Sequence, residues 1–132
     1  MFTQVKETPD TALQIETWLK QADCQYNLGN YTRAATVYES VAEKYPNSRW
    51  EEEAVYAMGL CKIKLGRDAD AIEKFENFLG KSAASALAQN IAIEAAKLYL
   101  RQNQIEKAIE KIQFIEGTKD SPFKQEASRI RV

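Results

Sequence analysis

The sequence predicts an all-α chain in which three helical hairpins stack into an α-solenoid, followed by a short C-terminal capping helix. Three observations lead to this prediction. The 132 residues include only five glycines and three prolines, no segment sustains an alternation of apolar and polar residues, and small residues recur at an offset of 37. Without alternation no strand is expected, and a constant offset of this length is typical of stacked helical repeats.

Residues of the same size class fall in register when the chain is shifted by 37. Comparing 15–51 with 52–88 gives eight identities. The recurring small residues are Ala22, Gly59 and Ala96 in the first helix of each pair, and Ala34, Ala71 and Ala108 in the second. The larger residues one turn later are Tyr38, Phe75 and Ile112. Because small side chains let helix axes approach closely, we expect one domain over 1–132, built from units at about 15–51, 52–88 and 89–125.

Capping residues and helix breakers predict where each helix begins and ends. The starts are marked by Asn30, by Ser48 with Glu51 three residues later, and by Ser121 before Pro122. The stops are marked by Gly29, Tyr45-Pro46, Gly66, Gly80 and Gly117. The predicted helices span 10–28, 31–45, 49–65, 68–79, 84–101, 104–116 and 122–131. The last is expected to be a polar cap, or else the opening of a fourth unit.

Composition and charge argue against several classes of function. Eighteen basic and nineteen acidic residues give a net charge of −1, so no nucleic-acid partner is expected. The chain has no histidine, no glycine-rich phosphate loop and no metal-ligand spacing, so we expect no enzyme, no cofactor and no metal. No apolar run is long enough for direct membrane insertion. The expected compartment is the cytoplasm, or the periplasm if a signal or anchor has been removed.

The first unit resembles the tetratricopeptide repeat family, whose pattern is W-x₂-L-G-x₂-Y…A-x₃-F…P. It shows Trp18, Ala22, Leu28-Gly29, Ala34-x₃-Tyr38 and Pro46. The later units keep parts of this pattern, in Leu65-Gly66, Ala71-x₃-Phe75 and Ala108-x₃-Ile112, while Gln102-Asn103 replaces the third Leu-Gly. The longer period and the Tyr45-Pro46 junction are also similar to bacterial cell-envelope repeat proteins, namely the Tol-Pal coordinator and the outer-membrane assembly lipoproteins.

The resemblance implies a scaffold or adaptor whose first helices line a concave groove that binds a segment of another protein or a peptide. The candidate groove is the helical face without the signature residues, since its members share one side of each helix. These residues are Leu19, Asp23, Tyr26 and Asn27; Tyr56, Leu60, Ile63 and Lys64; and Ile93, Lys97, Leu100 and Arg101. Alternatively, they pack against the chain's own helices or against an N-terminal segment that contains Phe2 and Val5.

Self-assembly is the competing function, because an acidic first unit and a basic last segment favour head-to-tail stacking or a homo-oligomer. Lys64, Lys97 and Arg101 form either a basic corner for an acidic partner or an ordinary solvated surface, and the latter is preferred.

Several other features are expected to be structural. Cys24 and Cys61 are expected to be buried, and Trp18 is expected in the core. Trp50 and Tyr45 are expected to brace the junction between units. Glu51, Glu52 and Glu53 suit the first turn of a helix.

Overall fold

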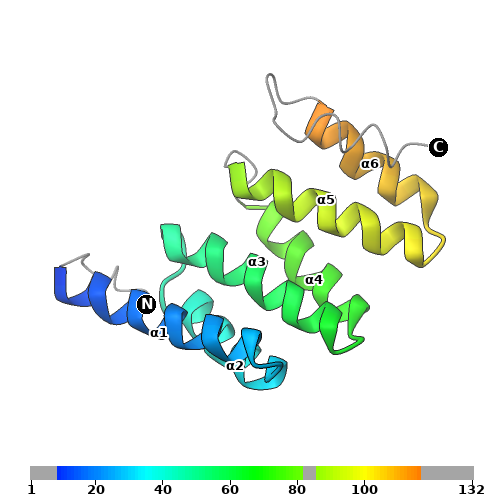
Figure 1. Cartoon of the computed structure of the whole chain (residues 1–132). Helices are drawn as coiled ribbons and strands as arrows, with labels where there is room; N and C mark the ends of the chain where they lie inside the picture. The colour runs from blue at the N-terminus through cyan, green and yellow to red at the C-terminus, as the bar shows by residue number, and fades with distance from the viewer. Residues whose placement is uncertain (1–8, 82–85, 117–132) are drawn as a thin grey trace. The chain divides into compact units, whose positions relative to one another are not determined.

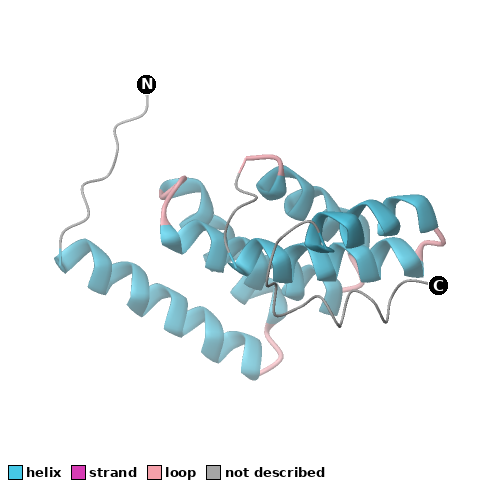
Figure 2. Ribbon diagram, turned by 90° about the horizontal axis from the view of Figure 1, so that it is seen from above, coloured by secondary structure: helices cyan, strands magenta, loops and turns pink. Residues whose placement is uncertain are grey.

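The computed structural model describes residues 9–81 and 86–116, and these form six α-helices joined by loops (Figures 1 and 2). Within the described ranges there is no strand, which confirms the predicted all-α class. The helices are α1 (Pro9–Asn27), α2 (Tyr31–Lys44), α3 (Arg49–Lys64), α4 (Asp68–Leu79), α5 (Ala86–Arg101) and α6 (Ile105–Glu116). The predicted bounds of these six helices are correct to within two residues. The predicted helix over 122–131 lies outside the described residues.

The chain separates into two compact units, Met1–Gly66 and Arg67–Val132. In the first unit α2 packs against both α1 and α3, and α1 also touches α3. In the second unit α5 packs against both α4 and α6. The boundary falls inside the predicted repeat 52–88, between its two helices.

The residues that define the repeat are all buried. Ala22, Ala34, Ala71, Ala96 and Ala108 are each 0 % exposed, and Gly59 is buried with them. Tyr38, Phe75 and Ile112 are 2 %, 0 % and 1 % exposed. The offset of 37 therefore reports equivalent packing positions, as expected when small residues permit close helix contact and large residues fill the space beside them.

The same left-handed turn follows the first helix of each hairpin. Gly29, Gly66 and Asn103 lie one period apart and have φ values of +84°, +76° and +59°. In the first and third turns the residue after this position donates its backbone N–H to a carbonyl five residues earlier, with an N···O distance of 2.8 Å. Asparagine tolerates the left-handed conformation better than most residues. Asn103 thus preserves the turn although the third unit lacks the Leu-Gly pair.

The start of α3 is capped as the sequence predicts. Ser48 Oγ accepts a hydrogen bond from the Glu51 backbone N–H at 3.3 Å, and the Glu51 carboxylate accepts one from the Asn47 backbone N–H at 2.9 Å. The pair supplies side-chain acceptors for two backbone donors at the start of α3, where the Glu51 N–H also donates to the Ser48 carbonyl at 3.1 Å. Next to it, the Tyr45 and Trp50 rings meet edge to face with centroids 6.3 Å apart, so both rings lie at the α2–α3 junction.

Candidate functional site

The predicted groove residues lie on the first helices of the hairpins, α1, α3 and α5. Eight belong to the first unit, where α1 and α3 are in contact. The four on α5 belong to the second unit and are described separately. We call the first group the α1–α3 face; its members are Leu19, Asp23, Tyr26, Asn27, Tyr56, Leu60, Ile63 and Lys64.

The α1–α3 face keeps part of its apolar surface accessible. Tyr26, Tyr56, Leu60 and Ile63 are half-buried, and Asn27 and Lys64 are exposed. Leu19 is only 4 % exposed, because it continues the buried stripe of α1 that includes Ile15 and Ala22. Leu19 therefore belongs to the core, and the accessible apolar surface comes mainly from α3 and from Tyr26.

The α5 residues divide in a similar way. Ile93 is 2 % exposed, within a helix whose residues Ile91, Ala92, Ala95 and Ala96 are also buried. Leu100 is half-buried, whereas Lys97 and Arg101 are exposed. Ile93 thus packs in the interior. This agrees with the alternative interpretation, in which these residues pack against the chain's own helices.

Both α5 cations are paired within the second unit. Arg101 Nη2 lies 2.7 Å from Asp68 Oδ2, and Lys97 Nζ lies 3.7 Å from Glu94 Oε2. Lys64 belongs to the first unit. Because both α5 side chains are paired with carboxylates, α5 carries less uncompensated positive charge than a basic corner would require.

Carboxylates gather on the α1–α3 face. The Tyr38 hydroxyl donates a hydrogen bond to Asp23 Oδ1, which fixes this carboxylate between α2 and α1. Burial, this bond and the Asp23 charge raise the pKa of the Tyr38 phenol far above its ordinary value, so Tyr38 remains a donor well into the alkaline range. Across on α3, partial burial and then the charge of Asp23 raise the pKa of Glu53, although Lys20 opposes them.

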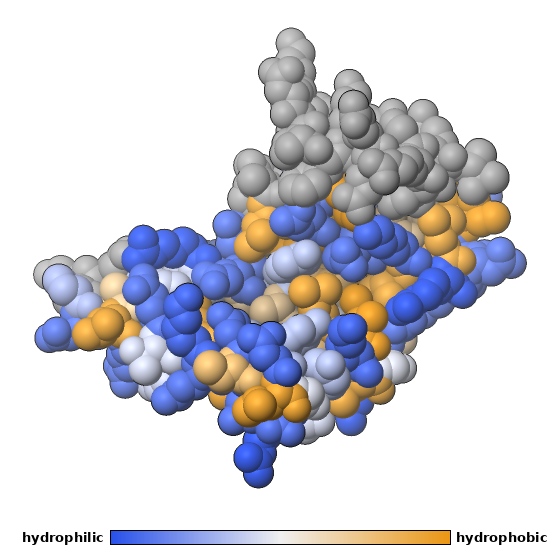
Figure 3. Space-filling view, viewed as in Figure 1, coloured by the Kyte–Doolittle hydropathy of each residue, from blue (hydrophilic) through white to orange (hydrophobic). Residues whose placement is uncertain are grey.

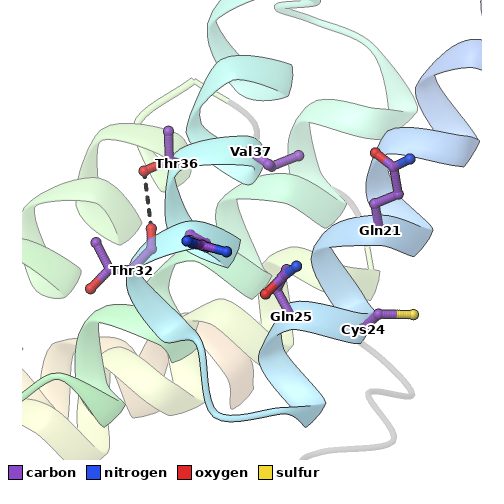
Figure 4. A pocket seen from close by; sticks show the side chains of 7 residues that line it. Gln21, Cys24, Gln25, Thr32, Thr36 and Val37 are labelled. Atoms are coloured by element: carbon purple, nitrogen blue, oxygen red, sulfur yellow. Dashed lines mark hydrogen bonds between the residues drawn. The ribbon is translucent and has the colours of Figure 1, made fainter.

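A pocket of about 630 Å³ between α1 and α2 was not anticipated from the sequence (Figure 4). Its lining residues are Gln21, Cys24, Gln25, Thr32, Arg33, Thr36 and Val37. Cys24 is exposed, so its predicted burial is wrong, whereas Cys61 is 0 % exposed as predicted.

The environments of the two cysteines differ because of what packs beside them. Helix α2 packs against α3, which carries Cys61, but no described helix of the first unit packs on the corresponding side of α1. A signal for this exists in the sequence. Thr17 and Gln21 stand where the next unit has Ala54 and Met58, and polar residues at these positions favour an exposed side.

The described residues contain no group of three or more acidic or cysteine side chains that could hold a metal ion. Within the same residues, no helix is both long and apolar enough to span a bilayer. On the face drawn in Figure 3, apolar patches lie among hydrophilic residues. Among the large apolar side chains, Leu13, Leu28, Ile105 and Ile109 are 66 %, 74 %, 49 % and 36 % exposed.

A family model described as tetratricopeptide repeat matches residues 16–48 and 53–85, which together make up half of the chain. No curated protein matches the chain. Among solved structures, the Yersinia enterocolitica type III secretion translocator chaperone SycD has a TM-score of 0.72 and 18 % identity, over 90 % of this chain and 86 % of SycD. The same chaperone in complex with a peptide of the translocator YopD also has a TM-score of 0.72, with 19 % identity over 93 % and 88 %.

The tetratricopeptide repeat domain of P58(IPK) is a third similar structure. Its TM-score is 0.64 and its identity is 19 %, over 89 % of this chain and 33 % of that one. At such identities the likeness concerns the fold. The expected likeness to cell-envelope coordinators and lipoproteins gains no support from these matches.

Proposed function

This chain belongs to the tetratricopeptide repeat family, and we propose that it is a scaffold that binds a segment of a partner protein on the α1–α3 face. The observation that carries the proposal is the accessible apolar surface of Tyr26, Tyr56, Leu60 and Ile63 on two helices in contact. Apolar side chains that stay partly accessible on two helices in contact favour an interaction site.

The SycD complex adds support of a different kind. SycD resembles this chain over nearly its whole length and has been solved with a peptide of a translocator. A chain of this size and fold is therefore large enough to hold a peptide. Aromatic and branched aliphatic side chains on the α1–α3 face would supply most of the binding free energy, while polar residues at its margin, such as Asn27 and Lys64, set the register of the bound segment.

The proposal is tested by placing a photo-reactive amino acid at Tyr56 and identifying the cross-linked protein in the native source. Leu60→Glu is expected to abolish the cross-link, because it places a charge in the middle of the apolar surface. Leu28→Glu is the matched control, since Leu28 is 74 % exposed and lies outside this face.

Both variants are expected to keep the melting temperature within a few degrees of the parent, since Leu28 is exposed and Leu60 is only half-buried. A large loss of stability in Leu60→Glu would show that Leu60 serves the core. An unchanged cross-link in a folded Leu60→Glu variant would refute binding on this face.

Self-assembly is a second candidate function, supported by exposed apolar residues on the first and the last described helix, α1 and α6. Within each unit the second helix of one hairpin packs against the first helix of the next, as α2 does on α3 and α4 on α5. Ile105 and Ile109 on α6 are free to make the same kind of contact with Leu13 on α1 of another copy. Thr17 and Gln21 make the α1 side more polar than its internal equivalents, which ranks this candidate second.

Sedimentation velocity over a range of concentrations separates the two functions. Self-assembly predicts a sedimentation coefficient that rises with concentration, and Ile109→Glu should reverse the rise. A monomer at high micromolar concentration and low salt would eliminate self-assembly while leaving partner binding intact.

A further inference from the structure

The α1–α3 face adjoins a local excess of negative charge, to which Asp23 of the face and three further carboxylates of α1 and α3 contribute. Glu16, Asp23, Glu52 and Glu53 act together electrostatically, since the charges of the other three each disfavour ionisation of Glu53. The nearby cations are Lys20, which favours ionisation of Glu53, and Arg49, whose Nη2 lies 3.7 Å from Glu16 Oε1. Around Glu53, four carboxylates against two cations leave the surface negative, while Lys64, the cation among the face residues, lies eleven residues further along α3.

Asp23 is the best positioned of these carboxylates. It is half-buried on α1, and the Tyr38 hydroxyl holds one of its oxygens. A carboxylate has room for several hydrogen bonds, so the other oxygen of Asp23 keeps acceptor capacity. Because the Tyr38 side chain that holds it is 2 % exposed, the Asp23 carboxylate is positioned before any partner arrives, and little side-chain entropy is lost when it binds a cation.

The apolar residues follow the carboxylates by one helical turn. Tyr26 lies three residues after Asp23, and Tyr56 lies three residues after Glu53. Residues three and four apart are neighbours on a helix surface. Each carboxylate therefore adjoins an aromatic ring, and on α3 the apolar surface continues to Leu60 and Ile63.

We infer that the α1–α3 face takes a partner segment in which a lysine or arginine is flanked by apolar side chains. The inference rests on the proposed function and adds the chemistry of the partner. The basic group pairs with Asp23 and Glu53, and the flanking side chains cover Tyr56, Leu60 and Ile63. A positively charged side chain of the partner reduces the mutual repulsion of these carboxylates. Coulomb attraction also raises the rate at which the partner associates with the face.

Two synthetic peptides test this inference. Both contain 15 residues with the same leucines at the same positions; one carries four lysines and the other four glutamates in their place. Fluorescence anisotropy at low salt should show at least about tenfold tighter binding of the lysine peptide. The net charge of the chain is only −1, so a general attraction of the whole molecule does not account for such a difference.

Charge-neutralising variants show which residues cause the preference for the lysine peptide. Glu53→Gln and Asp23→Asn should each weaken the lysine peptide by about three- to tenfold and leave the glutamate peptide unchanged or slightly tighter. Glu43→Gln makes the same change in net charge on α2, outside the face, and should have no effect. Equal weakening by all three variants, or no weakening by Glu53→Gln and Asp23→Asn, would overturn the inference.

A further variant separates this inference from the proposed function. Leu60→Ser removes apolar surface without adding charge and should weaken both peptides. If both peptides bind equally and depend on Leu60, the face binds segments but the basic preference is wrong. If neither peptide binds up to about millimolar concentration, the basic–apolar chemistry is rejected. If Leu60→Ser leaves the affinity of both peptides unchanged, then the proposed binding face itself is wrong.

Discussion

Cys24 and Cys61 occupy equivalent positions in the repeat but lie in opposite environments. Cys61 is 0 % exposed on α3, and burial raises the pKa of its thiol to about 11. Cys24 is exposed beside the α1–α2 pocket. Since the thiolate is the reactive form, the two thiols should differ in reactivity even though they occupy equivalent positions in the repeat.

We predict that a thiol reagent at pH 7.5 labels Cys24 at least about 100-fold faster than Cys61, because Cys61 is buried and its raised pKa lowers its thiolate fraction. The rates are measured on Cys24→Ser and Cys61→Ser variants, each of which keeps one thiol. In denaturant the two variants should react at similar rates. Fast labelling of Cys61 in the folded protein would contradict its burial.

The Tyr99 phenol is expected to make the stability of the second unit depend on pH in the alkaline range. Its hydroxyl donates to Glu76 Oε2 at 2.6 Å, and Lys111 forms an ion pair with the same carboxylate. Burial and this hydrogen bond raise the pKa of Tyr99 above its ordinary value. Above pH about 10 the unfolded chain loses the phenol proton while the folded chain keeps it, so stability falls as the pH rises.

Tyr99→Phe is therefore expected to lower stability at pH 7 by about 1 kcal/mol and to make the decline between pH 9 and 11 shallower. Melting temperatures over this range check the prediction. Tyr38→Phe should behave in the same direction in the first unit, since the Tyr38 hydroxyl donates to Asp23. Unchanged slopes in both variants would contradict the assigned role of the two phenols.

At the scale of elements, the helix ends show how different side chains serve the same position. Ser48 and Asn30 both precede a helix, but only Ser48 caps it with its side chain. The Asn30 amide instead donates to Gln25 Oε1 at 2.7 Å. The sequence predicts where both helices begin, whereas the choice of hydrogen-bond partner depends on how the preceding turn brings Gln25 close to Asn30.

Ser48→Ala is expected to lower the free energy of unfolding by about 1 kcal/mol, because it removes a cap from the first turn of α3. Asn30→Ala should cost less, since its side chain accepts no hydrogen bond from α2. Urea denaturation of both variants provides the measurement. A larger loss for Asn30→Ala than for Ser48→Ala would reverse the assignment of the caps.

The helices and the small buried residues were predictable because both follow from short-range rules. Glycine and capping residues mark helix ends, and the offset of 37 identifies equivalent positions such as Ala34 and Ala71. The environment of an equivalent position was less predictable. Cys24 is exposed, and Leu19 and Ile93 are buried, because exposure depends on which helix packs alongside, and periodicity carries no information on that.

At the scale of the whole molecule, each of the two units has its own core. Ile15, Val41 and Cys61 are fully buried side chains of the first unit, and Ile91, Leu98 and Ile112 are fully buried side chains of the second. In repeat proteins, stability is approximately a sum of the stabilities of repeats and of the contacts between neighbours. A substitution inside one core should therefore lower mainly the stability of the unit that contains it.

Both tryptophans, Trp18 and Trp50, lie in the first unit, so tryptophan fluorescence reports on that unit while far-UV circular dichroism reports on all helices. Ile112→Ala, at the repeat position of Tyr38 and Phe75, should destabilise the second unit by about 2–5 kcal/mol. In urea titrations the dichroism transition should then move to lower urea or become biphasic, while the fluorescence transition moves much less. Val41→Ala in the first unit is the control and should shift the fluorescence transition. If Ile112→Ala displaces both transitions equally, the two units unfold as one cooperative body.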